Sequence, residues 1–267
     1  MKKTHFLAFA LALAAGCAFS QTVSFGLTFD HQTYVKGEPV VLTLKLVNQG
    51  VAPIIISDYE AYSANKLVFE IIPQDGRQLT QSREGAIVDD LSLERDEGQA
   101  IKINLSNWFV FDVARYRIRA QLFCNGLRYD SLPEVFDVVP GIELAKATHY
   151  VSLHPAVERT LTLVYWAREG REIAFLRGDD RQTGAFCQTL VLGDVMRVKT
   201  PSIERKADED GVFYVYRQVN RDTLSRVEVA SDAKGLHPRD VKRAVESASS
   251  PMIDSLREAV ERKASRR

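Results

Sequence analysis

The sequence has few of the residues that build metal centres. Its 267 residues include three cysteines and five histidines. No C-x-x-C or H-E-x-x-H motif occurs. The two histidines of HYVSLH, His149 and His154, are five residues apart, a spacing that puts their rings on different faces of a helix or strand. The sequence therefore predicts no metal ion and no cofactor.

The scarcity of cysteine also limits disulfide bonding. Cys124 and Cys187 could pair in an oxidising compartment, and the bond would tie the two halves of the chain together. The alternative, which we prefer, is two buried thiols. Cysteine behaves as a small hydrophobe, and these two lie in neighbouring β-like runs with no spacing motif.

No charge of one sign dominates the sequence. The chain has 35 Lys and Arg against 35 Asp and Glu. Without the first 20 residues, which hold two lysines and no acid, the balance is 33 against 35. Such a chain has no overall field that attracts polyanions, which argues against nucleic acid as a partner. We expect a protein or an envelope polymer as the partner.

Apolar runs long enough to matter for targeting occur only near the N-terminus. Met1-Lys2-Lys3 is followed by an unbroken apolar run over residues 6–15 and then by small residues, which is typical of an export signal over residues 1–20. The run is too short to cross a bilayer, and the later run over residues 51–56 has only the length of a strand. We therefore expect export and no transmembrane segment.

Two processing sites compete in this signal. Ala18-Phe19-Ser20 before Gln21 has the small residues that signal peptidase requires, and we favour it; the product is periplasmic or extracellular. Residues 14–17, AAGC, resemble a bacterial lipobox, which would leave a lipidated Cys17 and a protein anchored in the envelope. A lipobox usually begins with leucine, and here an alanine occupies that place.

From residue 22 to about residue 140 the apolar residues recur with a period of two. The alternating sets are Val23, Phe25, Leu27 and Phe29; Leu42, Leu44 and Leu46; Leu67, Phe69 and Ile71; Ile101, Ile103 and Leu105; and Tyr116, Ile118, Ala120 and Leu122. Turn signals such as Asp75-Gly76 and Asn125-Gly126 separate the runs. This pattern predicts about seven strands in antiparallel sheets with one buried face each.

One segment of this region resembles a known family. Asp112, Ala114, Tyr116 and Ile118 fit the D-x-A-x-Y-x-apolar pattern of the tyrosine corner of immunoglobulin-like domains. Residues 37–50, GEPVVLTLKLVNQG, also resemble a strand and turn of secreted bacterial sandwich domains. The resemblance implies an immunoglobulin-like β-sandwich over residues 22–140. It implies a cystine-free one, because Ile118 replaces the usual disulfide cysteine, and it implies almost nothing about function.

The second half is predicted to begin with a connector over residues 141–157. Residues 158–235 form a β-rich domain in which two weakly repeated hairpin units occur, over residues 161–180 and 212–232. Two such units would make a small sandwich or two blade-like sheets, and a complete propeller needs at least four blades. We favour a compact β-sheet domain.

The pattern of residues 236–267 predicts helices. From Pro238 on, Val241, Ala244, Val245 and Ala248 recur at helical spacing, and Ser250-Pro251 has the residues that open a second helix. The last six residues, 262–267, form a basic tail. Its cations either complement the helix C-terminus or contact an anionic lipid or polymer. The predicted fold class is thus mainly β with C-terminal helices.

Motifs for catalysis are scarce. No G-x-S-x-G occurs, and Ser231 to Lys234 match S-x-x-K without its companion elements. Asp208-Glu209-Asp210-Gly211 resembles half of a calcium loop but lacks the other ligands, so we interpret it as a hairpin turn. The sequence therefore predicts no catalytic residue.

These observations favour an exported, non-enzymatic binding or scaffold protein of a bacterial cell envelope. The first alternative is a hydrolytic or carbohydrate-active enzyme whose carboxylates converge from separate strands, drawn from Asp89, Asp90, Asp179, Asp180 and Asp222. The second alternative is a sandwich of the proteinase-inhibitor type, which would act through an exposed loop.

Overall fold

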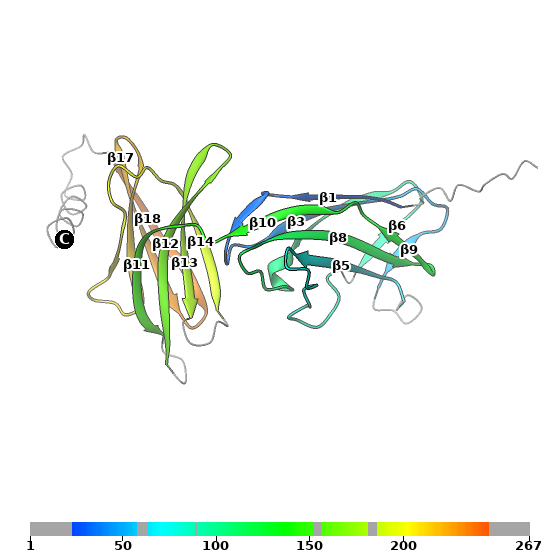
Figure 1. Ribbon diagram of the computed structural model, residues 1–267, viewed down its shortest axis with the longest axis horizontal. Helices are drawn as coiled ribbons and strands as arrows, with labels where there is room; N and C mark the ends of the chain where they lie inside the picture. The colour runs from blue at the N-terminus through cyan, green and yellow to red at the C-terminus, as the bar shows by residue number, and fades with distance from the viewer. Residues whose placement is uncertain (1–22, 58–63, 89, 152–155, 181–185, 246–267) are drawn as a thin grey trace, which may run out of the picture.

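The computed structural model describes residues 23–57, 64–88, 90–151, 156–180 and 186–245. These residues are mainly β, in open and largely antiparallel sheets, and they contain no α-helix. A single turn of 3₁₀ helix, η2 (Leu105–Asn107), is present. Figure 1 shows two layered β modules, and the strands of the second run across the long direction of the first. We call them the N-terminal module (residues 23–139) and the C-terminal module (residues 142–245).

Two main sheets form the N-terminal module. The first contains β1 (Val23–Phe29), β3 (Val41–Asn48) and β7 (Gly98–Asn104). The second contains β2 (Thr33–Val35), β10 (Glu134–Val139), β8 (Ala114–Cys124) and β5 (Lys66–Pro73), with β9 (Leu127–Asp130) also paired to β8. A small pair, β4 (Ile54–Ile56) and β6 (Leu91–Leu93), is separate. Among the strands described in this module, only β2 and β10 pair in parallel.

Alternation along the strands explains how these two sheets close on one core. In β3, Leu42, Leu44 and Leu46 are buried, and they pack in one cluster with inward residues of β8 such as Ile118 and Leu122. The residues between them on β8 are wholly or partly exposed. Because side chains alternate between the two faces of a strand, each sheet has one apolar and one polar face.

The C-terminal module consists of two four-stranded meanders. The first is β11 (Ile142–Val151), β12 (Val157–Arg168), β13 (Arg171–Asp180) and β14 (Cys187–Asp194). The second is β15 (Ser202–Arg205), β16 (Val212–Asn220), β17 (Thr223–Asp232) and β18 (Gly235–Val245). Leu163 and Leu176 of the first meander share a core cluster with Val215 and Val229 of the second.

The two repeated units found in the sequence occupy equivalent places in this module. Residues 161–180 lie in the β12–β13 hairpin, and residues 212–232 form the β16–β17 hairpin. Each hairpin is the centre of its own meander. The similarity of the two segments therefore corresponds to two strand pairs that contribute to one core.

Two predictions for the second half are wrong. The expected connector over residues 141–157 is mostly strand β11, paired with β12 along its length. The helix expected from Pro238 is strand β18, which pairs with β17. Pro238 lies at an irregularity of that pairing, where the missing N–H is tolerated. Apolar spacing over so few residues does not separate a strand from a helix when the neighbouring strand supplies the hydrogen bonds.

Several other predictions fall outside the described residues. These are the export signal over residues 1–20 with Cys17, the second helix and the basic tail within residues 246–267. The half calcium loop lies within the described part, and residues 206–211 form the turn between β15 and β16.

Candidate functional site

The segment around Tyr116 fixes one end of the sheet that contains β8. The Tyr116 hydroxyl donates a hydrogen bond of 2.8 Å to the backbone carbonyl of Asp112. Its ring stacks on Phe136, with centroids 5.1 Å apart, and meets Phe111 edge-on. Burial raises the pKa of the Tyr116 phenol above its usual value. The hydrogen bond and the ring contacts hold Tyr116 in place, and they leave its outward neighbours on a rigid base.

A groove of about 380 Å³ lies over this base. It is lined by Ile72, Pro73, Gln74, Gly76, Arg115, Tyr116, Arg117 and Val135, from β5 and the turn after it, β8 and β10. The volume lies within the range of small-ligand pockets, and the lining combines apolar side chains with two guanidinium groups. We treat this groove as the candidate functional site.

The two arginines of the groove differ in their partners. Arg115 forms a two-pronged ion pair with Asp137, with N–O distances of 2.8 and 3.0 Å. The pair raises the pKa of Arg115 and lowers that of Asp137. Arg117 is exposed, and among the described residues no carboxylate forms an ion pair with it. Arg117 is therefore the guanidinium that the groove offers to a ligand.

Apolar side chains flank Arg117 on both sides. In the strand register, Ile72 of β5 and Val135 of β10 lie directly opposite Arg117. Val135 is 46% exposed, although a valine on a strand is usually covered. On the outer face of the sheet, an apolar, a cationic and a second apolar side chain thus lie side by side on three neighbouring strands.

A second notable region is the joint between the two modules. The β2–β3 turn contacts the outer face of the first meander of the C-terminal module, as Figure 1 shows near β14. Val35 packs with Val164 and Phe175 in a small buried cluster. Thr189 donates two hydrogen bonds to this turn, from its N–H to the carbonyl of Gly37 (2.9 Å) and from its hydroxyl to that of Lys36 (2.6 Å).

A buried ion pair closes the joint. The guanidinium of Arg168, at the end of β12, donates to both carboxylate oxygens of Glu38, at 3.0 and 2.7 Å. It also donates to the carbonyl of Thr33, and the backbone N–H of Val35 donates to Glu38. Both charged side chains are buried. A planar guanidinium that meets a carboxylate through two parallel bonds restrains orientation as well as distance.

The approach of the two modules is close enough to require a glycine. Gly37 has a φ of +81°, and a Cβ added there would lie 2.7 Å from Sγ of Cys187. Burial, and after it the carboxylate of Asp179, raises the pKa of the Cys187 thiol to about 12. This thiol is therefore protonated at neutral pH and has little nucleophilic character.

Cys124 and Cys187 are both free. Strand β8 begins with Ala114, paired to Val138 near the joint, and Cys124 ends it ten residues later. Cys187 lies under Gly37 at the joint itself. The length of β8 therefore separates the two thiols, well beyond the reach of a disulfide.

A buried polar network lies at the end of the C-terminal module where β13 finishes. Arg159 donates to both carboxylate oxygens of Asp180, at 2.6 and 3.2 Å, and to the carbonyl of Asp232. Nearby, Nε2 of His149 and Oγ of Ser231 are 2.8 Å apart. His149 and Ser231 are 6% and 3% exposed. The pair has the distance of a base and a nucleophile, but its burial makes it part of the core.

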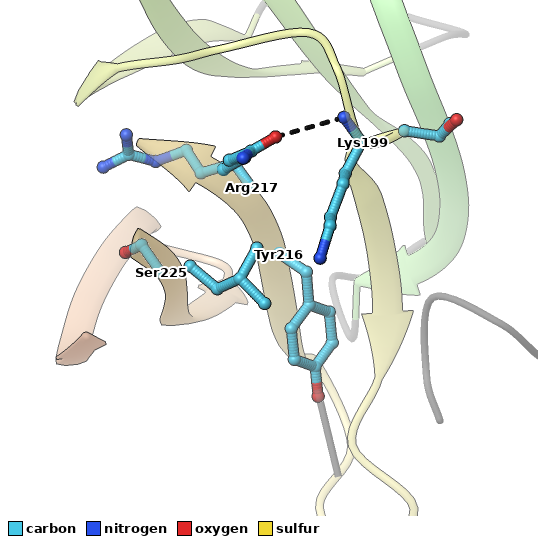
Figure 2. Close-up of a pocket in the computed structure, with 7 residues that line it drawn as sticks. Lys199, Tyr216, Arg217 and Ser225 are labelled. Carbon is cyan, nitrogen blue, oxygen red and sulfur yellow. Dashed lines mark hydrogen bonds between the residues drawn. The ribbon is translucent and has the colours of Figure 1, made fainter. Parts of the chain in front are cut away.

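The opposite part of this module holds a buried arginine. Arg217 is 3% exposed and donates to the carbonyls of Leu192 and Asp194 on β14. Burial lowers its pKa to about 10. Arg217 and Ser225 line, together with Lys199 and Tyr216, a cavity of about 10 Å³ that suits one water molecule (Figure 2).

The carboxylates of the enzyme alternative are spread over the chain, and the two that share a strand have different partners. Asp179 pairs with Arg177, whereas Asp180 pairs with Arg159 in the core. As successive residues of β13, these two acids point to opposite faces of the sheet. Asp90 is in the N-terminal module, Asp222 is in the β16–β17 turn, and Asp89 lies outside the described residues.

Two features are absent from the described part of the chain. No group of three or more His, Cys, Asp or Glu side chains there is arranged to hold a metal ion. Within the same residues, no helix has the length and apolar character needed to cross a membrane.

Sequence reasoning did not find the groove or the joint. The alternation in this run puts Arg115 and Arg117 on the solvent-facing side of the strand, but the pairing of β8 with β5 and β10 is not visible in the sequence. Glu38 and Arg168 are 130 residues apart, and no local sequence pattern indicates that they form an ion pair. The glycine of Gly37-Glu38 was the one available hint of a tight turn.

No family model matches this chain, and no curated protein matches it. Among solved structures, the sporulation control protein Spo0M of Bacillus subtilis is similar, with 9% sequence identity over 92% of this chain and 98% of that chain. The TM-score of this match is 0.29. A likeness of this size carries no argument about fold or function.

Proposed function

We propose that this chain is an exported, non-enzymatic binding or scaffold protein of a bacterial cell envelope. The observation that carries the proposal is the buried joint between the modules. Interfaces between domains of one chain are usually polar and permit motion. Here a two-pronged ion pair, an apolar cluster and two hydrogen bonds to one turn hold the modules in a fixed relation.

A scaffold needs its modules to be held in a fixed relative orientation. Two flexible modules would lose orientational freedom when both contact one partner, and that loss weakens binding. Modules already held in place avoid this cost. The groove beside Tyr116 then supplies a surface of defined shape on one of them.

We further propose that the N-terminal module is an immunoglobulin-like sandwich. Two features support this: the hydrogen bond from Tyr116 to the carbonyl of Asp112, and two sheets that close on one core. Export through residues 1–20, to the periplasm or the exterior or with Cys17 as a lipid anchor, is part of the same proposal. It rests on the sequence of that segment.

Co-purification tests the function directly. The full-length chain carries an affinity tag, is cross-linked in the envelope of its own organism, and is purified for mass spectrometry. We expect one dominant partner at near-stoichiometric yield. The matched variants are Glu38→Ala, which opens the joint, and Asp130→Ala, which removes an exposed ion pair with Arg128 away from the groove.

The two variants separate a scaffold from a simple binder. A scaffold loses its partner in Glu38→Ala and keeps it in Asp130→Ala. A robust hydrolase activity of the purified chain that disappears on substitution of one histidine or one carboxylate would contradict the proposal and favour the enzyme alternative.

A further inference from the structure

The residues that line the groove beside Tyr116 limit the class of ligand that can bind there. Its cationic centre is Arg117, since Arg115 already pairs with Asp137. Its walls are apolar, with Ile72 and Pro73 on one side and the exposed Val135 on the other. An occupant must therefore carry one negative group with apolar groups beside it.

The spacing across the strands sets the size of that occupant. Neighbouring strands are about 4.8 Å apart, so Ile72 and Val135 flank Arg117 at about that distance on each side. A guanidinium of this kind meets a carboxylate through two parallel hydrogen bonds. A single carboxylate with one apolar side chain on each side matches this row.

A polyanion matches the groove less well. A polymer with a charge on every unit gains affinity from several cations in a row. This groove has one available guanidinium, and a uniformly charged polymer has no apolar side chains to cover Ile72 and Val135. A peptide that contains one acidic residue between apolar residues satisfies both the charge and the walls.

We propose that the groove lined by Ile72, Arg117 and Val135 binds a peptide segment of a partner protein through one carboxylate flanked by apolar side chains. This inference rests on the proposed binding function and names the class of ligand for it. Because Tyr116 is locked by its hydrogen bond and its stacking on Phe136, the groove is formed before the ligand arrives.

The test uses nuclear magnetic resonance on the ¹⁵N-labelled full-length chain. The probe is the blocked peptide Leu-Gly-Glu-Gly-Val, in which the three side chains share one face of an extended chain, and the matched probe has Gln in place of Glu. We expect amide shifts in β8 and β10 around the groove with the Glu peptide, and binding of the Gln peptide weaker by about tenfold, the usual scale for losing a charge-assisted pair.

Three variants make the assignment specific. Arg117→Glu abolishes the shifts, and Arg117→Lys retains weakened binding because it keeps the charge without the planar fork. Arg95→Glu makes the same charge change in an exposed loop and leaves binding unaltered. Arg117 is exposed, so we expect its variants to unfold at the same temperature as the natural chain.

Several results would overturn the inference. One is equal binding of the Glu and Gln peptides, another is shifts that persist in Arg117→Glu, and a third is displacement of the peptide by polyphosphate at lower concentration. Co-purification keeps this failure distinct from failure of the proposed function. If the natural chain and Arg117→Glu capture the same partner equally, the groove is excluded as the binding site, and the proposed binding function is retained.

Discussion

The two modules bury very different side chains. Among the described residues, the N-terminal module buries three polar or charged side chains, Glu38, Asn48 and Ser131. The C-terminal module buries twelve: His149, Arg159, Thr160, Thr162, Arg168, Asp180, Thr189, Ser202, Arg217, Gln218, Ser225 and Ser231. The N-terminal core is thus held almost wholly by apolar packing, whereas the C-terminal module adds buried ion pairs and other buried polar side chains to its apolar core.

This difference determines how each module responds to substitution. An apolar core loses contacts in proportion to the volume removed, and exposed ion pairs around it contribute little. A buried ion pair behaves differently, since removal of one partner leaves an uncompensated charge in the interior. We therefore expect single polar substitutions to be far more damaging in the C-terminal module.

The largest effect is expected for Asp180→Ala. It leaves the guanidinium of Arg159, 1% exposed, without its carboxylate, and should lower the free energy of unfolding by about 3–5 kcal/mol. Denaturant unfolding measures this loss. Asp137→Ala, which breaks an exposed pair in the N-terminal module, should cost less than about 1 kcal/mol.

A double variant sharpens that comparison. Arg159→Met combined with Asp180→Leu replaces the pair with apolar groups and should recover most of the stability. Equal losses for Asp180→Ala and Asp137→Ala would show that the two modules do not differ in this respect.

The joint should be the next most sensitive position. Glu38→Ala leaves Arg168 buried with only the carbonyl of Thr33 as an acceptor, and should cost about 3 kcal/mol at the interface. Because the module cores are separate clusters, each should stay folded while their relative orientation spreads. Small-angle X-ray scattering detects this as a broader range of overall dimensions. An unchanged profile would mean that the apolar cluster around Val35 suffices to fix the joint.

Tyr116→Phe tests the N-terminal module by a smaller change. It removes the hydrogen bond to the carbonyl of Asp112 and keeps the ring that stacks on Phe136, and should cost about 1 kcal/mol in thermal or denaturant unfolding. Tyr150→Phe, the same change at a tyrosine of β11 that is 72% exposed, serves as the matched control. A loss as large as that of Asp180→Ala would contradict the view that apolar packing dominates this module.

The smallest effect at neutral pH concerns His149. Burial, and after it the charge of Arg159, lowers the pKa of the folded imidazole below its usual value of 6.5. The unfolded chain then binds more protons, so stability is fully present above about pH 6.5 and falls as the pH drops through that value toward the folded pKa. Unfolding measured from pH 7.5 to 5 should show this slope, and His149→Gln should remove it. An identical slope in the variant would assign the effect to other groups.

The strand pattern of the N-terminal module was predictable because it is local. Alternation in β3 and β8 places Leu44 and Ile118 in the core without knowledge of any partner. The same reasoning failed for β18. Its apolar residues are few, and pairing with β17 decided its conformation. The predicted connector failed for a related reason, since β11 is stabilised by β12, a strand that follows it in the chain.

The candidate site was less predictable than the fold. Arg117 is a site residue because Ile72 and Val135 flank it, and that row joins strands 45 residues before it and 18 residues after it in the sequence. The joint is similar, because the structural role of Glu38 depends on its ion pair with Arg168 of the other module. Neither arrangement has a local spacing that a single sequence displays.

The sequence by itself determined the β class, the main strands of the N-terminal module and the residues of the corner at Tyr116. These features depend on alternation and on contacts within a few residues, which the order of amino acids contains directly. The tertiary structure alone decided the meanders of the C-terminal module, the buried charges, the joint and the groove. Each of these joins side chains from separate strands, and only the packing of those strands brings them within bonding distance.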